Sequence, residues 1–167
     1  MKEMLRLVFS LLIVTVIATG LLSITYSLTR PFIDQAQQTM FDEQLQSFFP
    51  GYDEVIEIDE RLEVYKGTEM LGYAVLTTAP GYGGDIELLV AVALDRTVAG
   101  VSVLRQQETP GLGARIVEEQ FLSQFRGMSA EDLELTRFGG EVDAITSATI
   151  SSERVTSAVR VTVEELS

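Results

Sequence analysis

The chain has 167 residues, of which 25 are acidic and 12 basic, and it contains neither cysteine nor histidine. The absence of both residue types excludes disulfides, cysteine- or histidine-bound zinc, haem and iron–sulfur centres, and Ser-His-Asp or Cys-His catalysis. The net charge of −13 argues against nucleic acid as a partner, because the carboxylates would repel the phosphates. Carboxylate chemistry, a borrowed organic cofactor, or no chemistry remain.

Residues 7–29 carry no charge. As a helix they would rise about 34 Å, enough to cross a hydrocarbon core of about 30 Å. The run is longer than the apolar core of a cleaved signal peptide and no small-residue cleavage site follows it. We therefore predict a retained transmembrane anchor at residues 1–30. Lys2 and Arg6 precede the span and only Arg30 closely follows it, which predicts a single-pass protein of the cell (inner) membrane with a cytoplasmic N-terminus and an extracytoplasmic domain.

Residues 31–50 are predicted to continue the helix and to lay an apolar face on the following domain. Apolar side chains recur there at helical spacing: Phe32, Ile33, Ala36, Met40, Phe41, Leu45 and Phe48. A coiled-coil or partner-docking helix is the alternative. Pro50-Gly51 ends the helix.

Residues 51–167 are predicted to form one α+β domain, with a mainly antiparallel twisted sheet flanked by helices. Five β-branched runs are separated by short breaks and should pair as consecutive hairpins: 54–58, 62–67, 71–79, 86–94 and 97–104. The segment Leu88–Leu94 is almost entirely apolar, which predicts a central strand buried on both faces by helices.

The rest of the domain reads as mainly helical. We predict a helix over 114–125, a helix start at 129–132, a short strand over 133–138 and a last helix reaching Leu166. The buried face of that last helix should carry Val155, Ala158, Val159 and Val163.

Two glycine-rich loops interrupt this pattern. Pro80–Gly84 places three glycines around Tyr82, so that the backbone can approach a flat ligand beside the ring; a flexible hairpin loop is the alternative. Glu108–Gly113, with sequence ETPGLG, has Pro and Gly placed for a type II turn before a helix, and a plain connection is the alternative. Neither loop matches a nucleotide-binding fingerprint.

The segment Asp143–Ser152, DAITSATISS, runs from a Gly-Gly break into the last helix. Exposed N–H groups and the positive end of a helix dipole make such a start suitable for a phosphate. An ordinary helix cap is the commoner use of Ser and Thr there.

Together, GYGG, ETPGLG, the D-x-x-T-S-A-T segment and the N-terminal span resemble the covalent FMN-binding domain of the G subunit of Rnf ion-translocating ferredoxin:NAD oxidoreductase complexes. The related C subunit of the sodium-pumping NADH:quinone reductase shares these sequence features. The resemblance implies that a phosphoester joins FMN to the hydroxyl of Thr149. It implies no catalytic residue and no resident metal in this chain.

The remaining site residues are also carried by the resemblance. A flavin transferase would recognise Asp143, Thr146, Ser147 and Ala148, with Asp143 helping to bind the metal during transfer. Thr109, Leu112 and Gly113 would line the flavin ring. The other positions expected at the cofactor are Glu108, Gly111, Tyr82, Gly83, Gly84, Ile150 and Ser151. Two positions depart from the family pattern: Ser147 replaces a usual Gly, and Gln106 replaces a frequent His.

The function implied is an electron relay that is not self-sufficient. Its expected partners are the lipid bilayer, the flavin transferase and other subunits of a membrane redox complex, including one with a second flavin or an iron–sulfur centre. Two alternatives are the FMN subunit of a different membrane reductase, such as the quinone reductase above, and an anchored sensor or assembly module without flavin.

Overall fold

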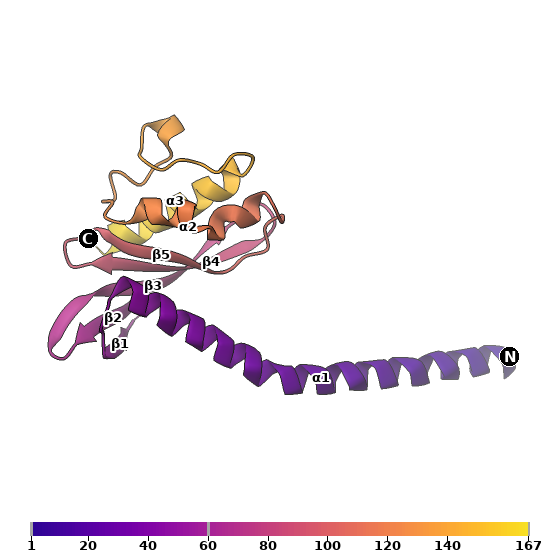
Figure 1. Ribbon diagram of the computed structural model, residues 1–167. Coiled ribbons are helices and arrows are strands. Elements are labelled where there is room, and N and C mark those ends of the chain that lie inside the picture. Colours follow the sequence, from indigo (N-terminus) through magenta and orange to yellow (C-terminus); the bar gives the residue numbers. More distant parts are fainter. Residues whose placement is uncertain (1, 60, 167) are drawn as a thin grey trace. The chain divides into compact units, whose positions relative to one another are not determined.

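The computed structural model describes residues 2–59 and 61–166, and in 2–5, 7 and 31–37 it describes the backbone alone. The chain divides into two units, Met1–Thr39 and Met40–Ser167, which are described separately. Helix α1 (Lys2–Phe48) provides the described part of the first unit and continues into the second. Figure 1 shows the strands and the shorter helices that follow it. The predicted division at residues 30 and 50 stays a prediction.

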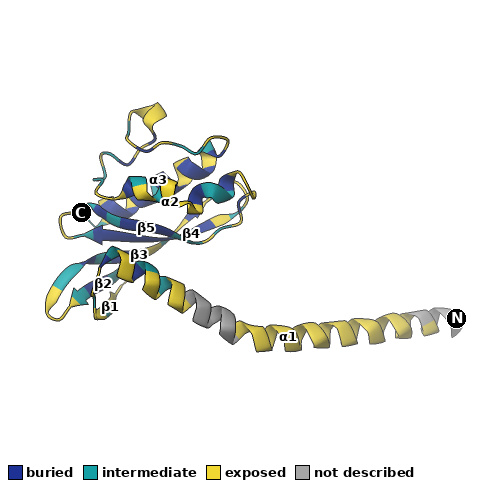
Figure 2. Ribbon diagram, viewed as in Figure 1, coloured by how far each residue is buried: buried dark blue, intermediate teal, exposed yellow. Residues whose placement is uncertain are grey.

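Val8–Arg30 is the one helical stretch among the described residues that is long and apolar enough to cross a membrane, with a mean hydropathy of 2.3. Its side chains are exposed throughout (Figure 2). The hydroxyls of Thr15, Thr25 and Thr29 donate to the carbonyls four residues earlier at 2.8–2.9 Å. These bonds matter because the bilayer core offers polar groups no water. The predicted N-terminal apolar helix is confirmed.

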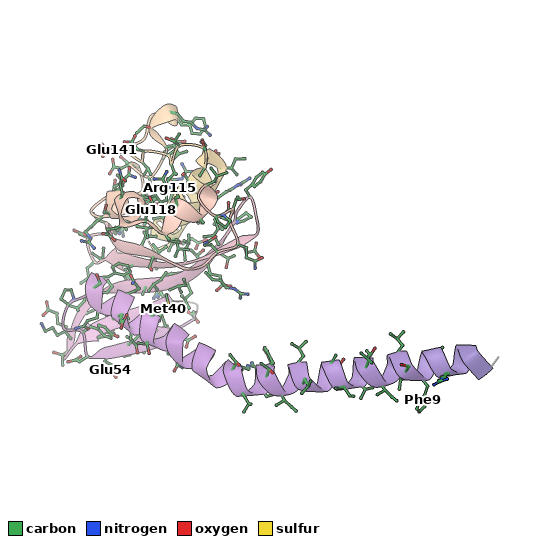
Figure 3. The ribbon with its side chains drawn as sticks, turned by 45° about the vertical axis from the view of Figure 1, so that its right-hand side comes forward. Phe9, Met40, Glu54, Arg115, Glu118 and Glu141 are labelled. Atoms are coloured by element: carbon green, nitrogen blue, oxygen red, sulfur yellow. The ribbon has the colours of Figure 1, made fainter. Side chains whose placement is uncertain are left out.

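The C-terminal turns of α1 belong to the second unit and contribute to its core. Leu45 and Phe49 are buried, and Phe41 and Phe48 are partly buried against the same cluster. The prediction that Met40 lies on this face is wrong, because its side chain is 48% exposed (Figure 3). Leu45 lies five positions further along the helix, so the two side chains point about 140° apart around the axis. The side chains of Phe32, Ile33 and Ala36 lie outside the described residues.

The sheet has five strands in the order β1-β2-β3-β4-β5, and every neighbouring pair is antiparallel. The strands are β1 (Glu54–Ile58), β2 (Arg61–Lys66), β3 (Glu69–Pro80), β4 (Asp85–Ala93) and β5 (Val98–Arg105). The predicted runs and their pairing as consecutive hairpins are confirmed, as is the α+β class. The order follows from the short connections, which leave each strand beside its predecessor.

Strand β4 is buried on both faces. Its side chains alternate between two clusters: Ile86, Leu88, Val90 and Val92 face one, and Leu89 and Ala91 face the other. The first cluster contains residues from the later helices, and the second contains the end of α1. The prediction of a strand covered by helices on both faces is therefore confirmed. It lies second from the edge of the sheet rather than at its centre.

The prediction of one helix over 114–125 is wrong. Three short pieces occupy the segment: the 3-10 helix η1 (Gly113–Val117), α2 (Glu119–Leu122) and the 3-10 helix η2 (Ser123–Phe125). Glu118 interrupts them with extended backbone, φ −69° and ψ 135°. In an unbroken helix Ile116 and Phe121 would point about 140° apart. The break allows both of them to be buried in one cluster.

The predicted strand over 133–138 is also wrong. Leu135 makes an isolated parallel bridge to Val142, and Thr136–Phe138 is the 3-10 helix η3. No helix begins at the described residues 129–132, because the Asp132 carboxylate accepts hydrogen bonds from both the N–H and the hydroxyl of Ser129 and closes a turn. The buried Leu133 and Leu135 anchor this irregular segment to the core.

Helix α3 (Thr149–Glu165) covers the sheet on the same side as α2 (Figure 1). Its predicted apolar face is confirmed: Val155, Val159 and Val163 are buried and Ala158 packs against them. Thr156 and Thr162 are buried as well, which the apolar pattern did not indicate. Their hydroxyls donate to the carbonyls of Ser152 and Ala158, so their burial leaves no unpaired donor.

Candidate functional site

Three segments that are distant in sequence meet at the carboxylate of Glu108. This side chain is 5% exposed. Its Oε1 accepts a hydrogen bond of 2.9 Å from the N–H of Gly83, in the β3–β4 loop. Its Oε2 accepts one of 2.6 Å from the hydroxyl of Ser151, in the first turn of α3. The structure thus brings together the GYGG loop, the ETPGLG loop and the start of the last helix.

At two glycines, the Glu108 carboxylate occupies the space that a side chain would need. A Cβ on Gly81 would overlap Oε1, and a Cβ on Gly113 would overlap Oε2. Gly83 is restricted in the same way by the carbonyl of Gln107. These glycines therefore permit the three segments to pack on one another, a different use from the approach to a flat ligand that the loop sequence suggested.

The ETPGLG segment forms the predicted type II turn. The N–H of Leu112 donates to the carbonyl of Thr109 at 3.1 Å, and Gly111 has φ +77°, as the third position of that turn requires. The carbonyl of Thr109 also accepts from Ala114 at 3.2 Å, which joins the turn to η1. The turn leaves Thr109, Gly111 and Leu112 exposed while Gly113 is buried.

Helix α3 begins without a capping side chain. Ala148 is the N-cap, and among the described residues no acceptor is bonded to the N–H groups of Thr149, Ile150 and Ser151. Within the same part of the chain nothing hydrogen-bonds to the Thr149 hydroxyl, which is half-buried. Capping, the commoner use of such hydroxyl residues, is therefore not their use here. The observed helix start instead leaves its N–H groups available to an anion.

Ser147 precedes this start in the left-handed region, with φ +68°. A glycine adopts this conformation without strain, whereas a Cβ makes it costly. Ser147 thus adopts a backbone conformation that favours glycine, the residue that the resemblance implies at this position. The hydroxyl of Ser152 holds the turn from inside, since it accepts from Ile145 N–H at 3.1 Å and donates to the Ala148 carbonyl at 3.0 Å.

Asp143 and Thr146 line a separate cavity of about 160 Å³, on the side of the segment that faces η1 and α2. The Gln124 amide fixes this segment, accepting from the N–H of Asp143 at 2.8 Å and donating to its carbonyl at 3.4 Å. Arg115 and Glu118 lie at the cavity with bonds of 2.9 and 3.0 Å between them (Figure 3). The hydrogen bonds from Arg115 lower the pKa of the Glu118 carboxyl.

The outer ends of the three segments each carry an exposed apolar side chain. The exposed fractions are 76% for Tyr82, 45% for Leu112 and 51% for Ile150. Gly84 is half-buried in the same loop as Tyr82. Large apolar groups left in water next to glycine loops are typical of a site that covers a ligand.

Sequence reasoning missed the residues that hold the site from behind. Gln106 accepts from the N–H of Glu108 at 2.5 Å, Gln124 pins Asp143, and Ser152 supports the turn before α3. Ser152 lies at the end of the predicted segment Asp143–Ser152, but glutamine and serine at such positions have no periodicity that would indicate a supporting role. The departure at Gln106 was the one available signal.

The part of the chain that contains these segments also matches a known protein family. Residues 81–164 match the FMN-binding domain family model. The chain is 32% identical to the G subunit of the ion-translocating oxidoreductase complex of Methanosarcina acetivorans, covering 99% of this chain and 96% of that protein. It is also 32% identical to the G subunit of the proton-translocating ferredoxin:NAD(+) oxidoreductase complex of Clostridium ljungdahlii, over 93% of this chain and 88% of that one.

The fold also occurs in a solved structure. The C subunit of the Na(+)-translocating NADH-quinone reductase of Parabacteroides distasonis superposes with a TM-score of 0.51 at 24% identity. The match covers 60% of this chain and 56% of the length of that one, so the likeness concerns the fold of the shared part.

Proposed function

The chain belongs to the FMN-binding domain family and, within it, to the G subunits of Rnf-type ion-translocating oxidoreductase complexes, and from this premise we propose that it relays electrons through an FMN joined by a phosphoester bond to Thr149. It is a membrane flavoprotein and an oxidoreductase subunit. The covalent bond, its position and the partners of the relay are the proposal.

The uncapped start of α3 is the observation that carries the proposal. Thr149 offers a hydroxyl without a partner among the described residues, and the N–H groups of Thr149, Ile150 and Ser151 lie at the positive end of a 17-residue helix. A phosphate ester on that hydroxyl would meet donors that otherwise have only water. The site thus fits the phosphate end of FMN in both charge and hydrogen bonding.

The exposed ends of the three segments suit the ring end of the cofactor. Leu112, Tyr82 and Ile150 provide apolar surface, and Thr109, Gly111 and Gly113 provide backbone beside it. When bound, FMN supplies the electron-transfer chemistry that the chain's own side chains lack. The protein's part is to orient the ring, restrict water around it and set the local charge. Gly83, Gly84 and Glu108 contribute by holding the loop that carries Tyr82.

We propose the segment Asp143, Thr146, Ser147 and Ala148 as the recognition surface for a flavin transferase. The backbone of Asp143 is fixed by Gln124, while its side chain and that of Thr146 are exposed. A fixed backbone with free polar side chains suits recognition by a second protein. The exposed Asp143 carboxylate is the group that would help to bind the metal during transfer.

The anchor sets where the relay works. We propose that the N-terminus is cytoplasmic and that Met40–Ser167 lies outside the inner membrane, beside another subunit with a second flavin or an iron–sulfur centre. Because the chain contains no cysteine, one introduced thiol gives an unambiguous label. Glu57→Cys, at an exposed position of β1, should react with a membrane-impermeant maleimide in intact spheroplasts. Reaction only after lysis would show that the domain lies on the cytoplasmic side.

The covalent bond is tested on a denaturing gel. The full chain, expressed with its flavin transferase, should show a fluorescent band that survives denaturation. Thr149→Ala should abolish the fluorescence, Thr149→Ser should retain it because the hydroxyl remains, and Ser157→Ala, two turns along the same helix, should leave it unchanged. Fluorescence that persists in Thr149→Ala would place the attachment elsewhere. A wild-type chain without fluorescence would favour an anchored module without covalent flavin.

A further inference from the structure

We propose that Glu108 is a positioning residue: a buried carboxylate that holds the three segments of the flavin site in one arrangement without touching the flavin. The inference rests on the proposed function for the identity of the ligand. The geometry behind it is independent of any ligand.

Both oxygens of the Glu108 carboxylate accept hydrogen bonds from the protein itself. Oε1 receives the Gly83 N–H at 2.9 Å and Oε2 receives the Ser151 hydroxyl at 2.6 Å. With 5% of the residue exposed, little of it remains accessible to a cofactor. The shorter distance lies within the usual range for an O–H···O hydrogen bond. Among the described residues no Lys or Arg pairs with Glu108, so the two hydrogen bonds hold its side chain.

The two bonds join elements that are distant in the sequence. Gly83 lies 25 residues before Glu108, and Ser151 lies 43 residues after it. The loops at 80–84 and 108–113 are rich in glycine and therefore lose much conformational freedom on ordering. One residue with two acceptors sets the GYGG loop against the first turn of α3, which begins two residues before Ser151 at Thr149.

The surroundings are built around this side chain. Gly81 and Gly113 have no room for a Cβ because each would overlap one oxygen of Glu108. Gln106 fixes the backbone of Glu108 by accepting its N–H at 2.5 Å. The carboxylate thus acts on the cofactor through the loops that carry Tyr82, Leu112 and Thr149.

The first test uses the full chain in detergent without flavin. Amide hydrogen exchange of Gly83 should become at least about tenfold faster in Glu108→Ala, since the N–H loses its hydrogen-bond acceptor. In Glu108→Gln it should stay within about threefold of wild type, because the amide oxygen accepts from Gly83 and the NH₂ donates to Ser151. Unchanged exchange at Leu89, in the middle of β4, would show that the fold is intact. Unchanged exchange of Gly83 in Glu108→Ala would overturn the proposal.

The second test uses the chain with flavin attached, and it separates positioning from stability. The visible circular dichroism of the bound flavin reports its orientation. It should change in Glu108→Ala, change in Ser151→Ala, and return to the wild-type shape in Glu108→Gln. The matched control is Glu141→Gln, an exposed carboxylate (Figure 3), which should have no effect. If Glu108→Ala fails to fold, Ser151→Ala decides: an unchanged spectrum in Ser151→Ala would overturn the proposal.

The two tests fail in different ways. If no flavin attaches to the chain, the proposed function fails while the exchange of Gly83 still decides the role of Glu108. If flavin attaches but neither exchange nor dichroism responds to Glu108, the function stands and the positioning role falls.

Discussion

The ring of Phe48, in the last turn of α1, fills the space in which a side chain of Gly100 in β5 would lie. A Cβ on Gly100 would overlap the ring, so the helix end and the sheet can approach only at a glycine. A Cβ on Gly72 in β3 would likewise lie 2.9 Å from the ring of Phe49, and closer still to the carbonyl oxygen of Val92. The C-terminal end of α1 and the residue after it thus pack on the sheet through two phenylalanines and two glycines.

This packing predicts that substitutions of Phe48 and Gly100 have non-additive effects on stability. Gly100→Ala should destabilise the chain by about 2 kcal/mol through overpacking. Phe48→Ala should also cost about 2 kcal/mol, since the ring is only partly buried. The double variant should be less destabilised than the sum by about 1 kcal/mol, because the smaller side chain makes room for the new methyl. Urea unfolding in detergent measures all three, and strict additivity would contradict the contact.

A second prediction concerns the left-handed Ser147. Ser147→Gly should raise the free energy of unfolding by about 0.5 kcal/mol, because removing the strained Cβ outweighs the entropy that glycine adds to the unfolded chain. Ser157→Gly, within α3, is the control and should lower it by about 0.5 kcal/mol. Thermal unfolding of the flavin-free chain checks both. A destabilised Ser147→Gly would mean that the Ser147 side chain makes a contact of its own.

A third prediction concerns Leu112. Leu112→Gln should shift the midpoint potential of the attached flavin while leaving its gel fluorescence intact, because the residue is expected at the ring and away from the phosphate. Its 45% exposure means that stability should change by less than about 1 kcal/mol. Val117→Gln is the matched control, an apolar residue with a similar exposure of 48%. Equal potentials in the two variants would remove Leu112 from the ring site.

A fourth prediction concerns acid. Hydrogen bonds from the hydroxyl and N–H of Ser129 lower the pKa of the Asp132 carboxyl below its usual value. A lowered pKa stabilises the fold above the usual aspartate value, and this contribution disappears as the pH falls through the folded value. Asp132→Asn should therefore be less stable than wild type at about pH 6, and the difference should shrink as the pH falls below the usual aspartate value. Ser129→Ala should show the same trend with a smaller amplitude, and a pH-independent difference would refute the assignment.

Most of the fold could be predicted from the alternation of apolar and polar residues and from the residues typical of turns. The five strands, their pairing and the apolar face of α3 depend on local periods that a sequence displays directly. The segment 113–142 was predicted less well, because tertiary packing of Ile116, Phe121 and Leu135 decides its backbone. There Glu118 is extended although the sequence around it has helical spacing.

At the site, the sequence identified the segments and the structure supplied the relation between them. Glu108, Gly113 and Ser151 were all named as site residues, yet nothing in the sequence indicated that they contact one another. Their contact depends on how the sheet brings a loop and a helix start together. The uncapped start at Ala148 is likewise a property of the backbone and was not readable from Ser and Thr.

The strand order has a consequence for synthesis. Each strand pairs with the one made immediately before it, so the sheet can assemble progressively as the chain elongates. The face of the sheet that packs against α3 is covered only once this last element has been made. Its side chains Val155, Val159 and Val163 complete the cluster over β4. Thr149 opens that same helix. A chain truncated before this point lacks both the cover of its core and the hydroxyl proposed to accept the flavin.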